Sequence, residues 1–193
     1  MATDSPDVRA ALVDEDVDVV LTGKAANGTA RCLLGLDQLL AAGEKAPDVV
    51  VNVQGDQPAL DPSHVDAAAQ MVHAGWDVGT VAAPLQTDAN QPRRVKVVVG
   101  PSGQGHWFSR QPIPTGGPYW MHVGVYAFTP ASLRRCVAAP PWAEVADERL
   151  EQLPWLGAGL RIGVAKVNAA VEPVDTAEDL VRLRGSDLGE ASR

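Results

Sequence analysis

The sequence has 193 residues, of which 46% are hydrophobic, so a single domain of ordinary size can bury a substantial core. With 16 Lys and Arg against 24 Asp and Glu, the formal net charge is −8, which argues against a nucleic-acid partner. An acidic substrate is still compatible with this charge, because a few Arg residues or a metal ion reverse the sign locally.

No apolar run approaches the roughly 18 residues that a membrane span requires, and the sequence shows no signal peptide at its start. We therefore expect no membrane partner and a cytoplasmic location. The two cysteines, Cys32 and Cys136, lie far apart without the spacing of metal ligands, and we interpret them as buried thiols in a reducing compartment.

Apolar runs typical of strands alternate along the chain with patterns typical of helices. The expected strands are 16–23, 48–53, 77–85, 94–100, 120–130 and 161–167, and the expected helices are 29–43, 62–75, 131–139, 148–156 and 176–185. This alternation predicts an α/β fold with an open, mostly parallel, Rossmann-like nucleotide-binding sheet flanked by helices. The run 48–53 is apolar on both faces, which predicts a strand in the middle of a parallel sheet.

The segment VVVNVQGDQP, residues 49–58, places Gln54, Gly55 and Asp56 directly after one of these strands. Gly, Asp and Pro all favour turns, so a simple turn is one interpretation. Ligands of open α/β sheets bind at the carboxyl ends of the strands, and a carboxylate there is suited to Mg²⁺. The segment is therefore also a candidate nucleotide site.

The same segment closely resembles the VNVQGDEP motif of the 3-deoxy-manno-octulosonate cytidylyltransferases, and six further segments resemble motifs of this family in the same order. They are NGTAR (27–31), RVKVVV (94–99), FSRQPIP (108–114), HVGVYAF (122–128), ERLEQLPWL (148–156) and VDTAEDLVRLR (174–184). The resemblance implies a glycosyltransferase-A-type sheet and transfer of CMP from CTP to the anomeric hydroxyl of a 2-keto-3-deoxy sugar acid, with release of pyrophosphate. It also implies a homodimer.

The resemblance assigns Asp56 and Asp175 as Mg²⁺ ligands and catalytic residues. Asp175 could instead cap the following helix, but Thr176 with Asp179 three residues later already supplies a capping box. Two carboxylates in turns of distant segments could converge at the edge of the sheet.

The other site residues are also implied by the resemblance. The nucleotide-binding residues are Gly28, Thr29, Arg31 and Gln54, and the sugar-acid pocket contains Arg110, His122, Glu151 and Gln152. An Arg suits a pocket for a carboxylate. Arg31 could equally be a solvated residue at a helix start, and His122 could equally be a neutral core histidine.

Three features depart from the family pattern. The sequence opens MATDSPDVRAA, similar to the family's ATDDERIAEA, and contains no segment like PARYxSSRLPGKPL, whose Arg and Lys grip the triphosphate. We therefore expect one domain, 1–193, truncated at its N-terminus, that binds CTP poorly and turns over slowly or not at all unless Lys24, Arg93 or Arg94 takes over that grip. Met121 stands where the family has an Arg, and Ala30 where it has an acidic residue.

Two alternatives to an active octulosonate-type cytidylyltransferase follow from these departures. One is a catalytically impaired short homologue that binds a sugar acid or a nucleotide. The other is a cytidylyltransferase of the sialic-acid type.

Overall fold

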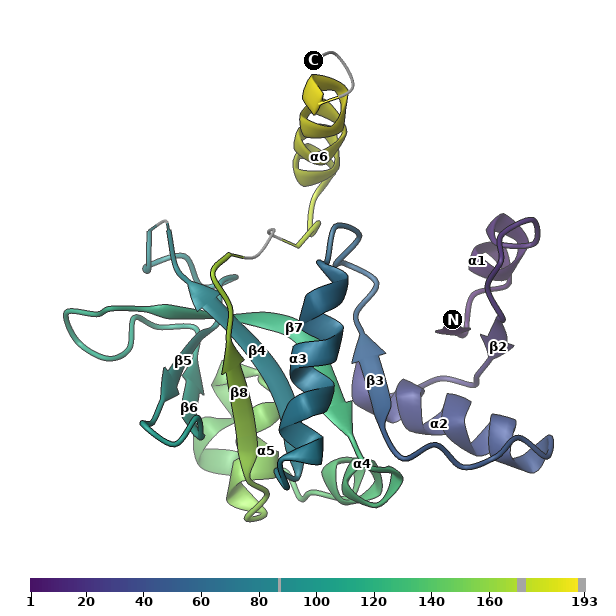
Figure 1. The fold of residues 1–193 in the computed structure, drawn as a ribbon, viewed down its shortest axis with the longest axis horizontal. Coiled ribbons are helices and arrows are strands. Elements are labelled where there is room, and N and C mark those ends of the chain that lie inside the picture. The colour runs from purple at the N-terminus through teal and green to yellow at the C-terminus, as the bar shows by residue number, and fades with distance from the viewer. Residues whose placement is uncertain (87, 170–172, 191–193) are drawn as a thin grey trace.

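The computed structural model describes residues 1–86, 88–169 and 173–190, and helices lie on both faces of its central sheet (Figure 1). The helices are α1 Pro6–Ala11, α2 Gly28–Ala41, α3 Pro62–His73, α4 Pro130–Val137, the 3₁₀ helix η1 Ala143–Glu148, α5 Gln152–Gly157 and α6 Ala177–Glu190. The strands are β1 Ala2–Thr3, β2 Val20–Leu21, β3 Val50–Val53, β4 Val78–Pro84, β5 Lys96–Val99, β6 Gly105–Ser109, β7 Trp120–Phe128 and β8 Ile162–Lys166.

The main sheet has the order β6-β5-β7-β4-β8, with β3 paired to β7. The predicted α/β class is confirmed, but the strand directions differ from a mostly parallel sheet. Among the described residues, β4 and β8 are parallel, whereas the pairs β3–β7, β4–β7, β5–β6 and β5–β7 are antiparallel. An apolar strand pattern does not specify the direction of its partner, and this explains the difference.

Strand β7 is the longest strand and organises the sheet. One of its edges pairs with β4 along the whole strand. The other edge is shared, because β5 pairs with Trp120 and Met121 whereas β3 pairs with the stretch from Val125 to Phe128. Between these two partners the edge of β7 contacts the residues that flank them, because the His122 N–H donates to the Val95 carbonyl oxygen at 2.8 Å and the Gly124 carbonyl oxygen accepts from the Gln54 N–H at 3.4 Å. A cavity opens beside this stretch of β7.

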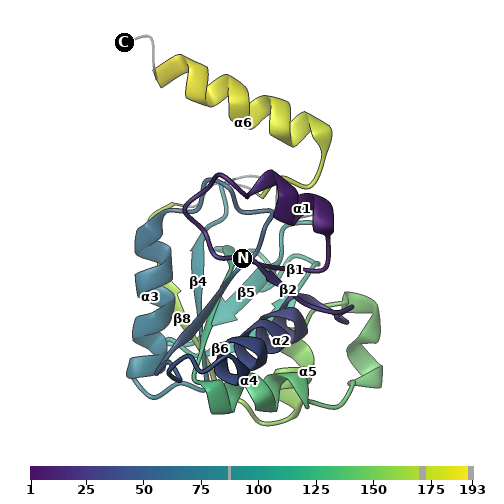
Figure 2. The ribbon, with the colours of Figure 1, turned by 90° about the vertical axis from the view of Figure 1, so that its right-hand side faces the viewer.

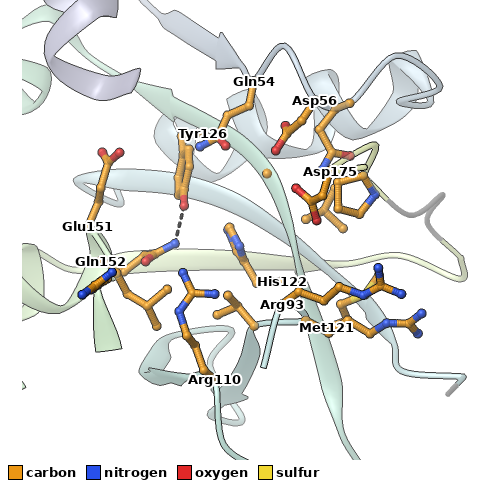
Figure 3. A pocket seen from close by; sticks show the side chains of 18 of the residues that line it. Gln54, Asp56, Arg93, Arg110, Met121, His122, Tyr126, Glu151, Gln152 and Asp175 are labelled. Atoms are coloured by element: carbon orange, nitrogen blue, oxygen red, sulfur yellow. Dashed lines mark hydrogen bonds between the residues drawn. The ribbon is translucent and has the colours of Figure 1, made fainter. Parts of the chain in front are cut away.

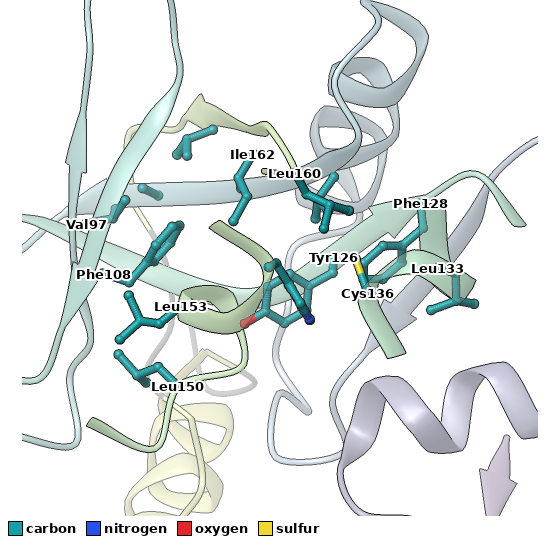
Figure 4. Close-up of a cluster of buried hydrophobic side chains, with 14 of the residues drawn as sticks. Val97, Phe108, Tyr126, Phe128, Leu133, Cys136, Leu150, Leu153, Leu160 and Ile162 are labelled. Atoms are coloured by element: carbon teal, nitrogen blue, oxygen red, sulfur yellow. The ribbon is translucent and has the colours of Figure 1, made fainter. Parts of the chain in front are cut away.

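Side chains of successive residues in β7 point to opposite faces of the sheet. Val123, Val125 and Ala127 pack toward α3, whereas Tyr126 and Phe128 belong to a second cluster on the other face (Figure 4). That second cluster also contains buried side chains of α2, α4 and α5, which are Leu36, Leu133, Cys136, Leu153 and Trp155. The sheet is therefore held between two apolar layers that fix the position of β7.

Two predicted strands differ from the structure. Of 16–23 only Val20–Leu21 forms a strand, and it pairs with β1 outside the main sheet. The run 48–53 forms β3, but this strand is half-buried, is antiparallel to β7 and leaves Val53 44% exposed, so it is not a central parallel strand. The predicted helices correspond to α2 to α6, with boundaries shifted by a few residues.

The elements at the two ends of the described chain lie at the periphery. Figures 1 and 2 show α6 standing apart from the sheet, and α1 with the β1–β2 pair lying beyond α2. Within the described residues, no helix combines the length and apolar character needed to cross a membrane. Cys32 and Cys136 are both free. Cys136 is buried as expected, whereas Cys32 is only half-buried.

Candidate active site

A cavity of about 510 Å³ lies beside the stretch of β7 between its partners β3 and β5 (Figure 3). Its floor is the middle of β7, and its walls come from the residues after β3, the residues before β5, the segment at the start of α5 and the residues before α6. The carboxyl end of β3 therefore contributes to the site as expected. The amino end of β5 and the middle of β7 contribute as well, because β3 and β5 run antiparallel to β7.

A local irregularity in β7 shapes the floor of this cavity. Opposite β4 the register shifts between the pairs Thr80–Tyr126 and Val81–Val123, so that β7 carries two extra residues, Gly124 and Val125. Such bulges re-aim side chains and occur often beside active sites. A Cβ on Gly124 would lie 3.2 Å from the side-chain Nε2 of Gln57. Glycine at this position therefore lets the turn after β3 approach β7 closely.

The two predicted metal ligands are brought together at one end of the cavity. The backbone N–H of Val174 donates a hydrogen bond of 2.8 Å to the carbonyl oxygen of Asp56, which ties the segment before α6 to the turn after β3. Asp56 and Asp175 both line the cavity, and their side chains point toward it in Figure 3. Burial, and then the charge of Asp175, raise the pKa of Asp56.

This carboxylate pair fits a hard divalent cation. The Oδ1 atom of Asp56 is buried without a hydrogen-bond partner among the described residues. Among the described residues, no group of three or more His, Cys, Asp or Glu side chains could hold a metal ion. Mg²⁺ commonly uses one or two carboxylates plus substrate phosphates, so two carboxylates beside an open cavity suffice.

The predicted capping box at the start of α6 is present. The Asp179 carboxylate accepts hydrogen bonds of 3.2 and 3.0 Å from the N–H groups of Asp175 and Thr176, and the Thr176 hydroxyl accepts one of 3.2 Å from the Asp179 N–H. Asp179 is buried, whereas Asp175 is exposed at the cavity. Asp179 therefore caps the helix, and the Asp175 carboxylate is available for a ligand.

Replacing Asp56 with Asn is expected to stabilise the metal-free protein at neutral pH. A carboxyl whose pKa is raised by folding destabilises the folded state when ionised. This penalty is complete above the raised pKa of Asp56 and disappears as the pH falls below the ordinary value for Asp. Thermal unfolding at pH 7 in the presence of a chelator would measure the effect.

Asp66→Asn is the matched control, because Asp66 is exposed on α3 away from the cavity. Mg²⁺ at ten times its dissociation constant should then stabilise the wild type by about 1.4 kcal/mol and leave Asp56→Asn unchanged. A metal-free Asp56→Asn protein less stable than the wild type would contradict the expectation.

At the other end of the cavity lies Arg110, the residue directly after β6. Its Nε donates a hydrogen bond of 2.8 Å to the carbonyl oxygen of Glu148, and its Nη1 donates one of 3.1 Å to the carbonyl oxygen of Pro92. In Figure 3 the guanidinium points toward His122 and Gln152. A fixed guanidinium can bind a ligand carboxylate through two parallel hydrogen bonds.

His122 lies on the floor of the cavity, and its hydrogen bonds indicate which ring nitrogen carries the proton. The Thr80 hydroxyl donates its hydrogen to the carbonyl oxygen of Val125 at 2.7 Å and also lies 2.9 Å from His122 Nε2. That hydroxyl must therefore accept from Nε2–H, and Nδ1 is left as an acceptor. Burial lowers the pKa of His122 to about 3, so the ring is neutral at pH 7.

Gln152 and Glu151 line the cavity at the start of α5. The Gln152 amide donates to the Tyr126 hydroxyl, as drawn in Figure 3, so the phenolic hydrogen can serve another acceptor. The Oε1 atom of Gln152 is buried without a hydrogen-bond partner among the described residues. These groups offer both donors and acceptors, which suits the hydroxyl groups of a sugar.

The four predicted nucleotide-binding residues are divided between the cavity and the start of α2. Gln54 lines the cavity. Gly28 and Thr29 begin α2, and the buried Thr29 hydroxyl donates to the Glu151 carboxylate. Arg31 does not line the cavity, and its guanidinium lies 3.1 Å from the Asp4 carboxylate and donates to the Thr22 hydroxyl at 2.9 Å. Nucleotide binding by Arg31 stays a prediction.

Several cavity residues were not assigned to the site from the sequence. They are Gln57, Arg93, Arg94, Tyr126 and Arg149. Arg93 and Arg94, named from the sequence only as substitutes for a phosphate grip, precede β5 and line the cavity, and Arg93 Nη1 lies 3.7 Å from Asp179 Oδ1. Arg149 has a left-handed backbone with φ 50°, which is an uncommon conformation for this residue type. The local sequence contains no signal that predicts this conformation. Lys24 does not line the cavity.

An α/β sheet with an edge cavity that combines a carboxylate pair and several arginines is suited to phosphate chemistry on a nucleotide. Comparison with known proteins identifies the class of nucleotide enzyme to which the chain belongs. The family model described as cytidylyltransferase matches residues 1–162, and the chain belongs to this family of nucleotidyltransferases.

The similar proteins include 3-deoxy-manno-octulosonate cytidylyltransferases of two bacteria. The protein of Anaeromyxobacter sp. (strain Fw109-5) is 38% identical over 191 residues, which cover 95% of this chain and 77% of that relative. The protein of Bradyrhizobium sp. (strain ORS 278) is 38% identical over 193 residues, covering 95% and 78%.

Solved structures agree with this assignment. The structure of CMP:2-keto-3-deoxy-manno-octonic acid synthetase complexed with CTP has a TM-score of 0.86 at 28% identity and covers 97% of this chain and 79% of that protein. A 4-diphosphocytidyl-2C-methyl-D-erythritol synthase has a TM-score of 0.59 at 16% identity over 94% of this chain and 75% of that protein, and shares the fold alone.

Proposed function

We propose that this protein transfers CMP from CTP to the anomeric hydroxyl of a 2-keto-3-deoxy sugar acid and releases pyrophosphate. The observation that carries the proposal is the division of the cavity into two ends. The carboxylates of Asp56 and Asp175 lie at one end, whereas Arg110 and the polar groups of His122 and Gln152 line the other. The names of the similar octulosonate cytidylyltransferases support the same substrates.

In this proposal the sugar-acid end orients the nucleophile. Arg110 binds the carboxylate of the sugar acid, and the Tyr126 hydroxyl and His122 Nδ1 bind hydroxyl groups as donor and acceptor. The buried Oε1 of Gln152 accepts a further hydroxyl hydrogen bond. The anomeric oxygen then lies toward the two carboxylates, where the α-phosphate of CTP is held. Positioning of this kind supplies a large part of the barrier reduction in transfer reactions.

The reaction forms one bond and breaks one. The anomeric oxygen attacks the α-phosphorus, the bond from that phosphorus to the bridging oxygen of pyrophosphate breaks, and the hydroxyl proton leaves to solvent. Mg²⁺ held by Asp56 and Asp175 would neutralise phosphate charge and stabilise the charge that develops in the transition state. Three cavity residues have guanidinium groups suited to binding the phosphates of CTP. They are Arg93, Arg94 and Arg149.

Two further features belong to the proposal. CTP is a cytosolic nucleotide, so the cytoplasm is the compartment that the reaction implies. A homodimer, which the family resemblance implies, stays a prediction that sedimentation equilibrium of the purified protein would check.

CTP is expected to be preferred over ATP, GTP and UTP by about 100-fold or more in kcat/KM. Sites that read a polar base edge through fixed hydrogen bonds discriminate strongly, because an analogue leaves buried groups unpaired. Gln54 at the cavity is the candidate reader. Pyrophosphate release with each nucleotide, at a fixed concentration of Mg²⁺ and sugar acid, measures the preference. Equal release from all four nucleotides would count against a cytidylyltransferase.

A further inference from the structure

Arg110 lines the cavity and is held by hydrogen bonds to both its backbone and its side chain. Its backbone N–H donates a hydrogen bond of 2.8 Å to Glu148 Oε2, and its Nε donates one of the same length to the Glu148 carbonyl oxygen. Its Nη1 donates to the Pro92 carbonyl oxygen, and its own carbonyl oxygen accepts a hydrogen bond from Lys96 Nζ. The backbone and the side chain of Arg110 are therefore both fixed.

Glu148, the last residue of η1, uses both oxygens of its carboxylate on the same turn of chain. Oε1 accepts a hydrogen bond of 2.5 Å from the Ser109 hydroxyl, and Oε2 accepts the hydrogen bond from the Arg110 N–H. With its carbonyl oxygen bound to Arg110 Nε, Glu148 contacts two consecutive residues through three acceptors. Both carboxylate oxygens and the carbonyl oxygen of Glu148 thus accept hydrogen bonds from Ser109 or Arg110. Glu148 itself does not line the cavity.

Lys96 supports the same turn from the opposite side. It begins β5, its side chain is fully buried, and Nζ donates to the carbonyl oxygens of Arg110 and, at 3.2 Å, Gln91. Burial lowers the pKa of Lys96, and the charge of Glu148 acts in the opposite direction. A buried cation is costly unless compensated, and Lys96 is compensated by the carbonyl oxygens of Arg110 and Gln91 and by the charge of Glu148.

We propose that Glu148 and Lys96 are positioning residues that hold Arg110 so that Nη2 and the second Nη1 hydrogen are presented to the carboxylate of an acidic substrate. Nε and one Nη1 hydrogen are already used within the protein, which leaves one face of the guanidinium for the ligand. An arginine fixed in advance loses little conformational entropy when it binds. The inference rests on the proposed function, because it assumes a carboxylate-bearing substrate.

The kinetic test uses Glu148→Gln, with Glu144→Gln as the matched control because Glu144 is exposed on the same 3₁₀ helix. We expect the KM for the sugar acid to rise about tenfold or more in Glu148→Gln, with the KM for CTP changed by less than about twofold. Glu144→Gln should match the wild type. With the amide of the sugar acid as substrate, the difference between Glu148→Gln and the wild type should disappear.

Lys96→Met provides a second variant of similar length, so that the inference does not depend on one substitution. It should raise the same KM without altering that for CTP, provided that circular dichroism confirms a folded protein. Equal rises in both KM values, or an equal loss with the acid and its amide, would show a general structural role and overturn the inference.

A measurement without substrate separates this inference from the proposed function. Nitrogen-15 relaxation of the Arg110 Nε–H should show a rigid side chain in the wild type and in Glu144→Gln, and a mobile one in Glu148→Gln. A mobile Nε–H in the wild type, or an unchanged rigid one in Glu148→Gln, would overturn the positioning role. A rigid wild type that releases no pyrophosphate with any sugar acid would overturn the proposed function alone.

Discussion

Replacing either Asp56 or Asp175 with Asn is expected to lower turnover by about 1,000-fold or more, while the fold stays intact. The change removes a ligand from a site that the structure supplies with only two carboxylates among the described residues. Metal ions contribute several kcal/mol of transition-state stabilisation in phosphoryl chemistry, and about 4 kcal/mol corresponds to a factor of about 1,000 in rate.

The measurement is pyrophosphate release at saturating CTP and sugar acid over a series of Mg²⁺ concentrations. Asp66→Asn serves as the control, and circular dichroism shows whether each variant is folded. If Asp175→Asn kept near-normal turnover in saturating Mg²⁺, a site of two carboxylates would be wrong.

Replacing Arg110 with Met is expected to lower kcat/KM for the sugar acid by about 10²- to 10⁴-fold. Two charge-assisted hydrogen bonds to the substrate carboxylate are lost, at about 1.5–3 kcal/mol each, and about 1.4 kcal/mol corresponds to a factor of ten. Arg135→Met on the surface of α4 is the control, since Arg135 pairs with Asp77 away from the cavity.

Initial rates over a range of sugar-acid concentrations at saturating CTP would measure this loss. Arg110→Lys keeps the charge without the planar pair of donors, so it should recover only part of the activity. A sugar-acid kcat/KM for Arg110→Met within about threefold of the wild type would exclude Arg110 as the carboxylate ligand.

Helix boundaries were the part of the fold most accessible from the sequence. The predicted helix 29–43 ends at Gly43, which has φ 96° and follows the end of α2 in the structure. This signal is local and depends on short-range chemistry. The same holds for Thr176 and Asp179, whose reciprocal capping contacts were anticipated from their spacing alone.

Strand partners and directions could not be obtained in this way. Strand β6, which contains Trp107 and Phe108, was not anticipated because its residues lack a clear alternation of apolar and polar side chains. The antiparallel pairing of β3 with β7 depends on contacts between segments about 75 residues apart, which no local pattern encodes. The expected mostly parallel sheet came from the alternation of strands and helices, which is a weaker guide to direction than to class.

The candidate site was likewise predictable only in part. The pairing of Asp56 with Asp175 was anticipated through a family resemblance, and the hydrogen bond from Val174 to Asp56 gives the physical link between the two segments. Tyr126 and Arg149 were missed because each reaches the cavity through tertiary structure, the first from an apolar-looking strand and the second through a left-handed backbone. Arg31 pairs with Asp4 in the structure, and its assignment to the nucleotide stays a prediction.

The most direct test of the proposed function is phosphorus-31 NMR of the full chain incubated with CTP, Mg²⁺ and a panel of 2-keto-3-deoxy sugar acids. We expect the CTP resonances to be replaced by those of pyrophosphate and of one phosphodiester, formed only when a sugar acid with a free anomeric hydroxyl is present. The appearance of CMP and pyrophosphate without a phosphodiester, or CTP that stays intact with every sugar acid, would contradict the account.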